Sequence, residues 1–448
     1  METIVIIVFL VGYLAITLEH NLKIDKLIPA LAMMAILWAV IALAELPVFE
    51  VNAELKELEA SHLDEMLLHH LGKTAEILVF LLGAMTIVEI IDYFNGFATI
   101  KGYIRTRSKR KLLWLFSILA FILSAIIDNL TATIVLVTIL QKVIKDRQTR
   151  LWFAGLIIIN ANAGGAWSPI GDVTTTMLWI ADKVSASQLV IHVLLPSIMC
   201  TVVPTLIASR KRIFQGQIEV DTSDNEESIS KFGPTMLYLG LGSIIFVPFF
   251  KTITHLPPYV GMMLSLAVVA TFAEIYSNAK FSISSLDRDT TEASDSASHH
   301  SPVHASLGKI ELPSILFFLG ILLAVAALES LGYLFHYAEG LNEAIPNTDW
   351  VVLLLGVGSA VIDNVPLVAA SMGMFSEGLD NPLWHFIAYS AGTGGSMLII
   401  GSAAGVVAMG MEKIDFFWYM RKIAWLALAG FLAGAVVFML LRDFVLHG

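Results

Sequence analysis

A short segment that could hold an ion occurs twice in this chain. The segment Ser124-Ala125-Ile126-Ile127-Asp128-Asn129 returns 235 residues later as Ser359-Ala360-Val361-Ile362-Asp363-Asn364, with five of six positions identical. Both copies lie inside apolar sequence, where a carboxylate costs about 2.5–3.5 kcal/mol on membrane-insertion scales. Two matched carboxylates in matched surroundings predict one ion site that is built from two halves of a duplicated protein.

A glycine-rich segment follows each copy. Residues 164–172 (GGAWSPIGD) align with residues 394–402 (GGSMLIIGS) at an offset of 230. Glycine clusters, with Pro169 in the first segment, weaken a helix, and a broken helix frees carbonyl and N–H groups that can bind ions. The polar residues beside the two predicted breaks are Asn160, Asn162, Ser168, Asp172, Thr174, Thr175, Thr176, Thr393, Ser396 and Ser402.

These side chains favour a cation as the bound species. Hydroxyl, amide and carboxylate oxygens suit hard cations. The three carboxylates Asp128, Asp172 and Asp363 lie in spans with almost no Lys or Arg, which argues against an anionic substrate. A carboxylate in low-dielectric surroundings also binds protons more readily, so one oxygen can hold Na+ or H+ but not both. That competition is the basis of exchange by alternating access.

The first break carries more charge than the second, because Ser402 stands where the first copy has Asp172. We therefore expect an asymmetric site, in which Asp128 and Asp172 supply the pair that exchanges protons for one ion. The expected neutral ligands or supports are Asn129, Asn162, Thr174 and Thr175. The alternative is that Asp172 only caps the half-helix that begins there.

The composition is that of a protein with many membrane spans. Hydrophobic residues make up 57% of the 448 residues, and the mean hydropathy is +0.78, both above the range of soluble proteins. The net charge of -11 speaks against a nucleic-acid partner, and the single Cys200 excludes an intrachain disulfide. Apolar runs long enough to span a bilayer occur near residues 2–19, 27–46, 74–94, 151–181, 186–208, 233–253, 257–277, 310–338, 383–411 and 417–441. The first of these predicts a retained helix, not a signal peptide, because it lacks a basic n-region.

Basic residues orient the two stretches that carry the Asp-Asn pairs. Residues 112–141 have clusters of Lys and Arg on both sides, whereas residues 350–376 are flanked by Asp and Glu alone. The positive-inside rule then predicts a re-entrant hairpin from the cytoplasm for the first stretch and one from the outside for the second. Non-helical backbone at their tips is tolerated only inside protein or a polar cavity. The alternative is two ordinary transmembrane helices, each with one buried Asp.

The predicted fold class is an all-α polytopic membrane protein of about ten transmembrane spans and two re-entrant helical hairpins, in an inverted-topology repeat with broken helices. We expect four parts. Residues 1–72 are N-terminal scaffold helices with an external acidic segment, and residues 73–212 are a first repeat with hairpin 112–141 and broken helix 151–181. Residues 213–308 hold an acidic loop, two connecting helices and a disordered linker. Residues 309–448 are a second repeat with hairpin 350–376 and broken helix 383–411. Residues 50–70 are predicted to form an amphipathic helix, whose His62, His69 and His70 lie on a solvated face or sense pH.

Four segments together resemble the NhaD-type sodium/proton antiporters of the ion transporter superfamily: SAIIDNLTAT, NANAGGAWSPIGDVTTT, SAVIDNVPLVAA and GTGGSMLIIGSAAG. The resemblance covers residues 74–411. It implies a scaffold domain that forms a homodimer, a transport domain with two opposed hairpins, and efflux of Na+ or Li+ in exchange for H+. It places Na+ at Asp128, Asn129, Asp363 and Asn364. The other residues that it implies or leaves as candidates are Ser124, Asn162, Asp172, Thr174, Thr175, Ser359, Ser396 and Ser402.

Other functions remain as alternatives at this stage. An anion or metalloid carrier of the same superfamily, for arsenite efflux or carboxylate transport, is disfavoured by the paired tip carboxylates. An intramembrane protease is disfavoured by the symmetric duplication and the glycine breaks, which catalysis does not need. We therefore expect a transporter, not an enzyme, whose Na+, Li+ and H+ are cargo and which has no resident cofactor. We expect it in the inner membrane of a bacterial cell, because no organelle-targeting segment is visible.

Overall fold

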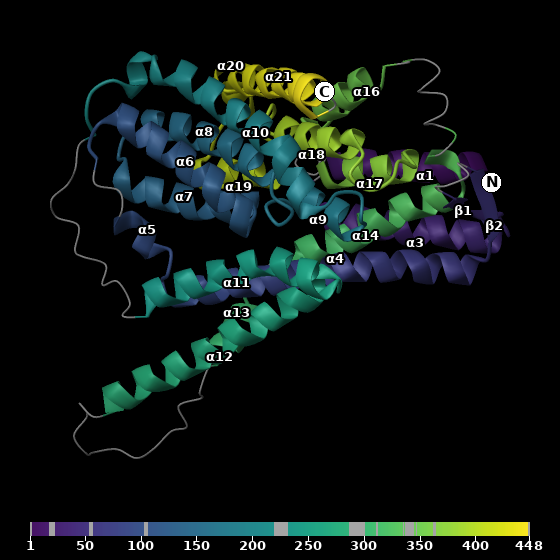
Figure 1. Cartoon of the computed structure of the whole chain (residues 1–448), viewed down its shortest axis with the longest axis horizontal. Coiled ribbons are helices and arrows are strands. Elements are labelled where there is room, and N and C mark those ends of the chain that lie inside the picture. The colour runs from purple at the N-terminus through teal and green to yellow at the C-terminus, as the bar shows by residue number, and fades with distance from the viewer. Residues whose placement is uncertain are drawn as a thin grey trace. The chain divides into compact units, whose positions relative to one another are not determined.

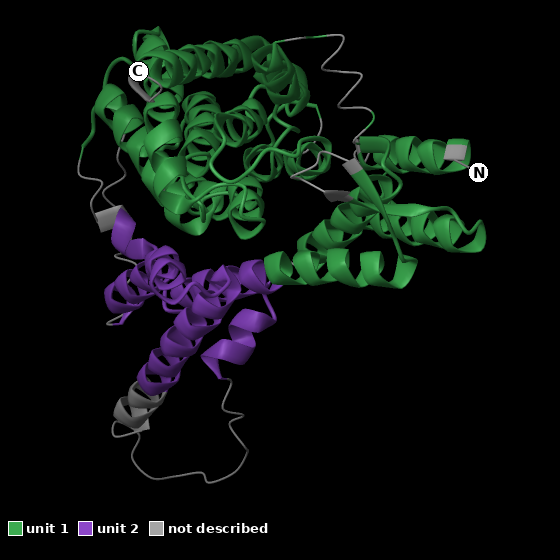
Figure 2. Ribbon diagram, turned by 45° about the vertical axis from the view of Figure 1, so that its right-hand side comes forward, with its two compact units in different colours: residues 1–78, 106–220, 312–448 green, residues 79–105, 221–311 purple. Residues whose placement is uncertain are grey.

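The computed structural model of the chain consists almost wholly of helices (Figure 1). It describes residues 2–17, 23–52, 57–102, 106–218, 232–285, 301–310, 312–334, 336, 345, 347–361 and 364–446. The chain divides into two compact units (Figure 2). Unit 1 comprises residues 1–78, 106–220 and 312–448, and unit 2 comprises residues 79–105 and 221–311.

The elements follow one another along the chain as a series of helices with one small sheet. Before the first hairpin come α1 (Glu2–Thr17), α3 (Leu27–Leu43), β1 (Val48–Asn52), β2 (Glu57–Ser61), α4 (Leu63–Tyr93) and α5 (Ala98–Gly102). The first hairpin and the elements after it are α6 (Lys109–Ile127), α7 (Asn129–Val143), α8 (Arg147–Gly165), α9 (Val173–Ile180), α10 (Ala186–Ser209) and the short η1 (Arg212–Phe214).

The second half of the chain repeats this order after a helical connection. The connecting helices are α11 (Gly233–Thr254), α12 (Pro258–Ser285) and α13 (Pro302–Leu307). The remaining elements are α14 (Leu312–Ser330), α16 (Thr348–Gly358), α17 (Asn364–Met374), α18 (Pro382–Gly394), α19 (Ala403–Glu412), α20 (Phe416–Lys422), α21 (Ala424–Leu441) and η2 (Arg442–Leu446).

Seven helices in the described part of the chain are long and apolar enough to cross a membrane. They are α4, α6, α10, α11, α12, α14 and α21. Shorter apolar helices accompany them, among them α7, α16, α17 and α19, which belong to the hairpins and the broken helices. The protein is therefore a polytopic membrane protein, as its composition predicts.

The predicted helix over residues 50–70 is wrong in its first half. Strands β1 (Val48–Asn52) and β2 (Glu57–Ser61) pair antiparallel, with Val48 opposite Ser61 and Glu50 opposite Glu59. The helix begins only at Leu63. The acidic residues suggested a solvated helix face, but Val48, Phe49 and Val51 are β-branched or aromatic and favour a strand once a partner strand is present.

The ends of the first hairpin meet at one end of unit 1. The backbone N–H of Lys109, at the start of α6, donates to Gly216 beyond the end of α10. Gln141, near the end of α7, donates to the carbonyl of Met411 at the end of α19. The Trp152 ring of α8 contacts both Phe214 and Trp418, which follow α10 and α19. The first hairpin thus enters and leaves unit 1 on one side, which we call the basic end.

The second hairpin enters from the opposite end. Asp349 lies at the start of α16, and Arg442 lies just beyond the end of α21. The two side chains form an ion pair at 2.6 Å. Helix α21 begins at the basic end, where Lys211 lies over the Trp425 ring, so Arg442 marks the far side. At the end of α17, the Phe375 ring contacts Trp384 at the start of α18. The two hairpins therefore point toward each other within unit 1.

Both long apolar segments after the hairpins are interrupted where the glycine patterns predict. Helix α8 ends at Gly165 and α9 begins at Val173, while α18 ends at Gly394 and α19 begins at Ala403. Residues Asp172 and Ser402 hold the same extended backbone at the N-terminal edge of α9 and α19, with φ and ψ of -151° and 150° against -148° and 152°. The two breaks are thus alike in backbone geometry.

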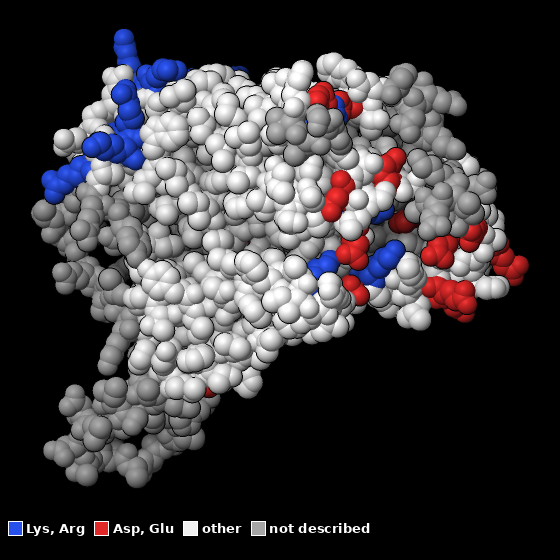
Figure 3. Space-filling view, viewed as in Figure 1, with Lys and Arg blue, Asp and Glu red and all other residues white. Residues whose placement is uncertain are grey.

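Charge is divided between the two ends of unit 1. Figure 3 shows Lys and Arg side chains gathered where α6 and α8 begin, and the visible Asp and Glu side chains mainly toward the opposite end, with a few Lys or Arg side chains among them. This is the pattern that the positive-inside rule requires of a membrane protein whose basic end faces the cytoplasm.

Unit 2 is held together by close packing of α11, α12 and the second half of α4. A Cβ at Gly83 would lie 2.7 Å from the Met262 side chain, and one at Gly240 would lie 2.5 Å from the Ile91 side chain. Small residues at these contacts let the helices approach closely, as is common in membrane proteins.

Candidate functional site

Asp128 forms the whole turn between the two helices of the first hairpin. Its φ of 76° is rare for a residue with a side chain, and it ends α6 and caps α7 at once. One carboxylate oxygen accepts the Thr131 N–H at 2.8 Å and the other accepts the Thr131 hydroxyl at 2.9 Å. Asp128 is therefore the N-terminal cap of α7.

The first hairpin tip joins both broken helices through uncharged side chains. The Asn129 amide donates to the Asn162 side-chain oxygen at 3.1 Å. The Asn162 amide donates in turn to the Ser402 hydroxyl at 3.0 Å and to the Ile158 carbonyl at 3.0 Å. All three side chains are buried. This chain of contacts connects α7 with α8 and with the second break.

The second hairpin tip meets a buried carboxylate. The Asn364 amide, at the start of α17, donates to Asp172 Oδ2 at 2.9 Å. Asp172 is 3% exposed, and its side chain makes no capping hydrogen bond to α9 although it stands at the capping position. The carboxylate of the first break is thus directed to the second hairpin, and the hypothesis that Asp172 is only a cap is wrong.

Two predicted serines have the same structural role in both halves. The Ser124 hydroxyl donates to the Ala161 carbonyl at 2.5 Å, and the Ser359 hydroxyl donates to the Ala391 carbonyl at 2.8 Å. Each bond ties a hairpin to the broken helix beside it. These serines hold the tips in place, and their hydroxyl groups are engaged in doing so.

Two glycines, Gly164 and Gly394, also have equivalent surroundings in the two halves. A Cβ at Gly164 would collide with the Phe121 carbonyl, and one at Gly394 would collide with the Gly356 carbonyl. The helices of each hairpin and broken helix therefore approach more closely than any side chain would allow. The hairpin positions differ by 235 residues and the broken-helix positions by 230, which are the offsets found between the repeated segments.

The four remaining predicted ligands have different surroundings. The Thr175 hydroxyl donates to the Asp172 carbonyl at 2.9 Å and so braces the start of α9. Thr174 is buried, and its hydroxyl makes no hydrogen bond within the described part of the chain. The Ser396 hydroxyl, just beyond the end of α18, donates to the Thr393 carbonyl at 2.7 Å and does not join the two tip networks. Asp363 lies outside the described residues.

The sequence did not single out two residues that matter here. Thr131 supplies both contacts to Asp128, and its position three residues after a capping Asp could have identified it. Gly392 stands beside the Asp172 carboxylate: a Cβ there would lie 3.7 Å from Oδ2. The offset of 230 matches Gly392 with Asn162 and could have marked the difference.

A separate cavity of about 280 Å³ opens in unit 1 toward the end opposite the basic end. Its charged and polar lining includes His70, Lys73, Lys183 and Glu329. The His70 ring is 6% exposed and lies 3.2 Å from the Ser330 hydroxyl, so His70 is not on a solvated face. Burial lowers the pKa of Lys183, which lies in the connection between α9 and α10.

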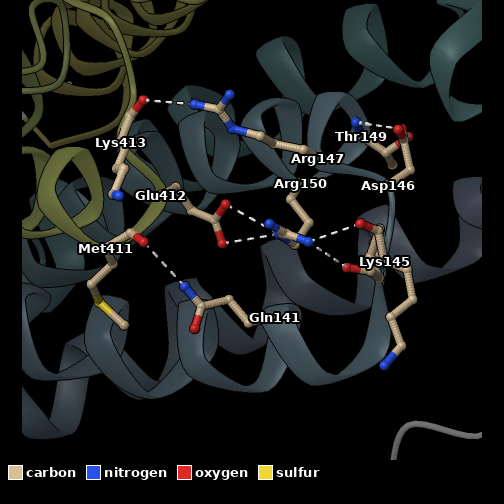
Figure 4. A network of polar contacts seen from close by, with 10 residues as sticks. Gln141, Lys145, Asp146, Arg147, Thr149, Arg150, Met411, Glu412 and Lys413 are labelled. Carbon is tan, nitrogen blue, oxygen red and sulfur yellow. Dashed lines mark hydrogen bonds and ion pairs between the residues drawn. The ribbon is translucent and has the colours of Figure 1, made fainter.

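A network of polar contacts closes the basic end of unit 1 (Figure 4). Arg150 donates from Nε to both oxygens of Glu412, at 3.1 and 3.2 Å, and from Nη1 to the Lys145 carbonyl at 2.9 Å. The Glu412 side chain is only 1% exposed. Arg147 adds a contact to the Lys413 carbonyl at 3.3 Å. The network fixes the start of α8 to the end of α19.

Paired hairpins and broken helices that bring polar groups together inside an apolar body are the architecture of a membrane transporter. Residues 4–384 match the family model described as "Citrate transporter". The chain belongs to this family.

Three relatives extend the comparison over nearly the whole chain. "Sodium/proton antiporter 1" of Arabidopsis thaliana is 41% identical over 98% of this chain and 72% of its own length. "Sodium/proton antiporter 2" of the same plant is 38% identical over 98% of this chain and 100% of its own length. "Na(+)/H(+) antiporter NhaD" of Vibrio cholerae is 31% identical over 98% and 91%. The resemblance to NhaD-type proteins is thus confirmed.

Proposed function

We propose that this chain is a secondary transporter that exports Na+ or Li+ in exchange for H+ by alternating access. The observation that carries the proposal is the buried Asp172 carboxylate in hydrogen-bond contact with Asn364 at the second hairpin tip. A carboxylate and amide oxygens at the edge of a broken helix suit a small hard cation. Relatives named as sodium/proton antiporters, aligned over nearly the whole chain, support the choice of ions.

Competition between Na+ and H+ for this carboxylate is one part of the exchange that we propose. Na+ can approach Asp172 only when the carboxylate has lost its proton, and a proton can return only when the cation has left. Asp128 at the first tip, and Asp363, which precedes Asn364 in the sequence, are the further groups that we propose to take part in this exchange. Asn129, Asn162, Ser402 and Asn364 supply neutral contacts, and Ser124 and Ser359 hold the tips. Thr174 and Thr175 complete the edge of the first break.

The two halves that we propose to alternate are an inverted-topology repeat. The matched contacts of Ser124 and Ser359 and of Gly164 and Gly394 support this proposal, because each recurs at the offset of the repeated segments. So do the hairpins, which enter unit 1 from opposite ends. In this proposal the first repeat takes residues 73–212 and the second takes residues 309–448.

An anion is the alternative cargo, and the family description names citrate. The contacts at the two tips argue against it. They join amides, a hydroxyl and a carboxylate, and no Lys or Arg side chain takes part in them within the described residues. An anion would meet the Asp172 carboxylate without a compensating positive charge.

The test is ion exchange in liposomes that contain the purified full-length protein and a pH-sensitive dye. We expect that an outward gradient of Na+ or Li+ drives protons inward and that K+ does not. Uptake of labelled citrate in the same liposomes serves as the second arm. Proton movement that ignores Na+ and Li+, together with saturable citrate uptake, would sink the proposal.

Orientation, assembly and location are further parts of the proposal. Cysteines placed at 108 and 146 should label from the cytoplasm, and one at 380 should label from outside; labelling of 108 and 146 from opposite sides would overturn the first hairpin. We propose a homodimer, to be tested by light scattering of the detergent-solubilised protein. The protein is a multi-pass membrane protein, and we propose the bacterial inner membrane as its location, to be tested by membrane fractionation.

A further inference from the structure

The two halves of the site differ at two of three matched positions. In the first half, Asn129 reaches Ser402 only through the side chain of Asn162. The matched positions in the second half are Asn364, Gly392 and Asp172. There the tip amide contacts the carboxylate directly at 2.9 Å. The middle member of the first chain of contacts has therefore no side-chain counterpart in the second.

Gly392 provides the space for this direct contact. A Cβ at this position would lie 3.1 Å from the Ala166 Cβ and 3.7 Å from Asp172 Oδ2. The first of these distances is tighter than ordinary van der Waals contact, and a side chain larger than Ala would enter the volume beside the carboxylate. In the first half that volume is filled by Asn162, which is 0% exposed. One half thus has a large residue, Asn162, at the position where the other half has Gly392.

The exchange also separates neutral from charged chemistry at the two breaks. Asn162 accepts one hydrogen bond and donates two, so both of its N–H groups and one lone pair of its side-chain oxygen are engaged in protein contacts. Ser402 accepts from Asn162 and from the Gly405 N–H at 3.2 Å. A cation in the first half would have to compete for the space that the buried Asn162 side chain fills, and it would find Ser402 and no carboxylate at the break. In the second half it would meet Asp172 and the Asn364 side-chain oxygen.

We propose that Gly392 is a positioning residue that admits one cation, held by Asp172 and Asn364, while Asn162 fills the matched space in the other half and closes it to a second cation. This inference rests on the proposed cation exchange and adds the number and place of the cations. On this proposal the two repeats have the same backbone arrangement, but only one of them binds a cation.

The test measures Na+ and Li+ binding to the purified full-length protein by isothermal titration calorimetry. The native chain should bind one cation per polypeptide. Gly392→Ala should weaken binding roughly tenfold while binding keeps its dependence on pH, because Asp172 is still present. The control is Gly410→Ala in α19, where a Cβ would meet nothing within 4 Å and binding should stay native.

A second pair of variants tests the closed half. Asn162→Gly combined with Ser402→Asp copies the open half onto the closed one and should raise binding from one cation per chain to two. A melting curve confirms that the variant is folded. If it does not fold, the Gly392→Ala measurement still decides the matter.

Three results would overturn the inference: two equivalent cations bound by the native chain, native affinity in Gly392→Ala, or a folded Asn162→Gly/Ser402→Asp variant that still binds one. A native chain that binds neither Na+ nor Li+ gives a different answer, because it rejects the proposed function itself. Binding by the native chain with no effect of Gly392→Ala rejects this inference and leaves the proposed function standing.

Discussion

The same two helices, α8 and α19, are joined at two levels by opposite kinds of chemistry. Between the hairpin tips, Asn162 contacts Ser402 through one neutral hydrogen bond at 3.0 Å. At the basic end, Arg150 holds Glu412 through both carboxylate oxygens and also binds carbonyls at the end of α7. A neutral hydrogen bond can be exchanged for another with little change in free energy, whereas a buried ion pair cannot. The inner contact can therefore rearrange while the end network keeps the helices in register.

The strongest test of this difference is Asp172→Asn. We expect the Na+ concentration for half-maximal exchange to rise roughly 10–100-fold, because a charged ligand is lost where the shape is kept. Glu412→Gln, at the end network, should leave that concentration within about twofold of the native value, because it touches no ligand. Dye-based exchange assays on both variants give the comparison. Equal effects would mean that the two levels do not differ in function.

Two substitutions of Asp128 can separate the role of its charge from its role as a helix cap. Asp128→Asn should abolish exchange while the protein is still made and folded, because Asn caps a helix as well as Asp does. Asp128→Ala should abolish exchange and also lower the free energy of unfolding by about 1 kcal/mol. Thermal melting of both purified variants measures the second effect. Native exchange by Asp128→Asn would remove Asp128 from the ion site.

At the end network, Arg150→Met should lower stability and leave ion affinity unchanged. It leaves the Glu412 carboxylate buried without its partner, a change that costs about 3 kcal/mol, at the lower end of the range for buried pairs since the Arg150 side chain is 21% exposed. The double variant Arg150→Met/Glu412→Met should recover most of the loss. A single variant that melts like the native protein would show that the pair does not hold the helices.

The smallest effect is expected at Asp146, which caps the start of α8. The Thr149 hydroxyl, and then its backbone N–H, lower the pKa of this carboxyl. The stabilisation is therefore present above the ordinary carboxyl pKa and is lost as pH falls through the lowered one. Thr149→Val should lower the melting temperature slightly at pH 7, and the difference should shrink in acid below both pKa values. A difference that grows with acidity would contradict this assignment.

Much of the architecture could be predicted because it depends on short sequence patterns. Repeated Asp-Asn pairs, glycine clusters and flanking charges located the hairpins and the breaks to within a few residues. The strands of residues 48–61 were missed because their acidic residues mask an alternating pattern, and strand pairing depends on a partner that a single segment does not reveal.

The partners inside the site could not be predicted in the same way. The Asp172–Asn364 contact joins residues 192 positions apart, and the Asn162–Ser402 contact joins residues 240 apart. Which of several polar groups meet depends on how two broken helices cross, and composition does not encode that crossing. The repeat offset drew attention to Asp172, Asn364, Asn162 and Ser402, but it could not show that Asp172 would contact the second hairpin and not cap its own helix.

At the single-residue turn formed by Asp128, the requirements of stability and of activity differ. Its φ of 76° with ψ of 162° is a conformation that suits glycine and is strained for any residue with a Cβ. Glycine at this position would relieve the strain but would remove the carboxylate. A search for hardier versions of this protein, if guided by melting temperature alone, would therefore drift toward variants that are better folded and unable to transport.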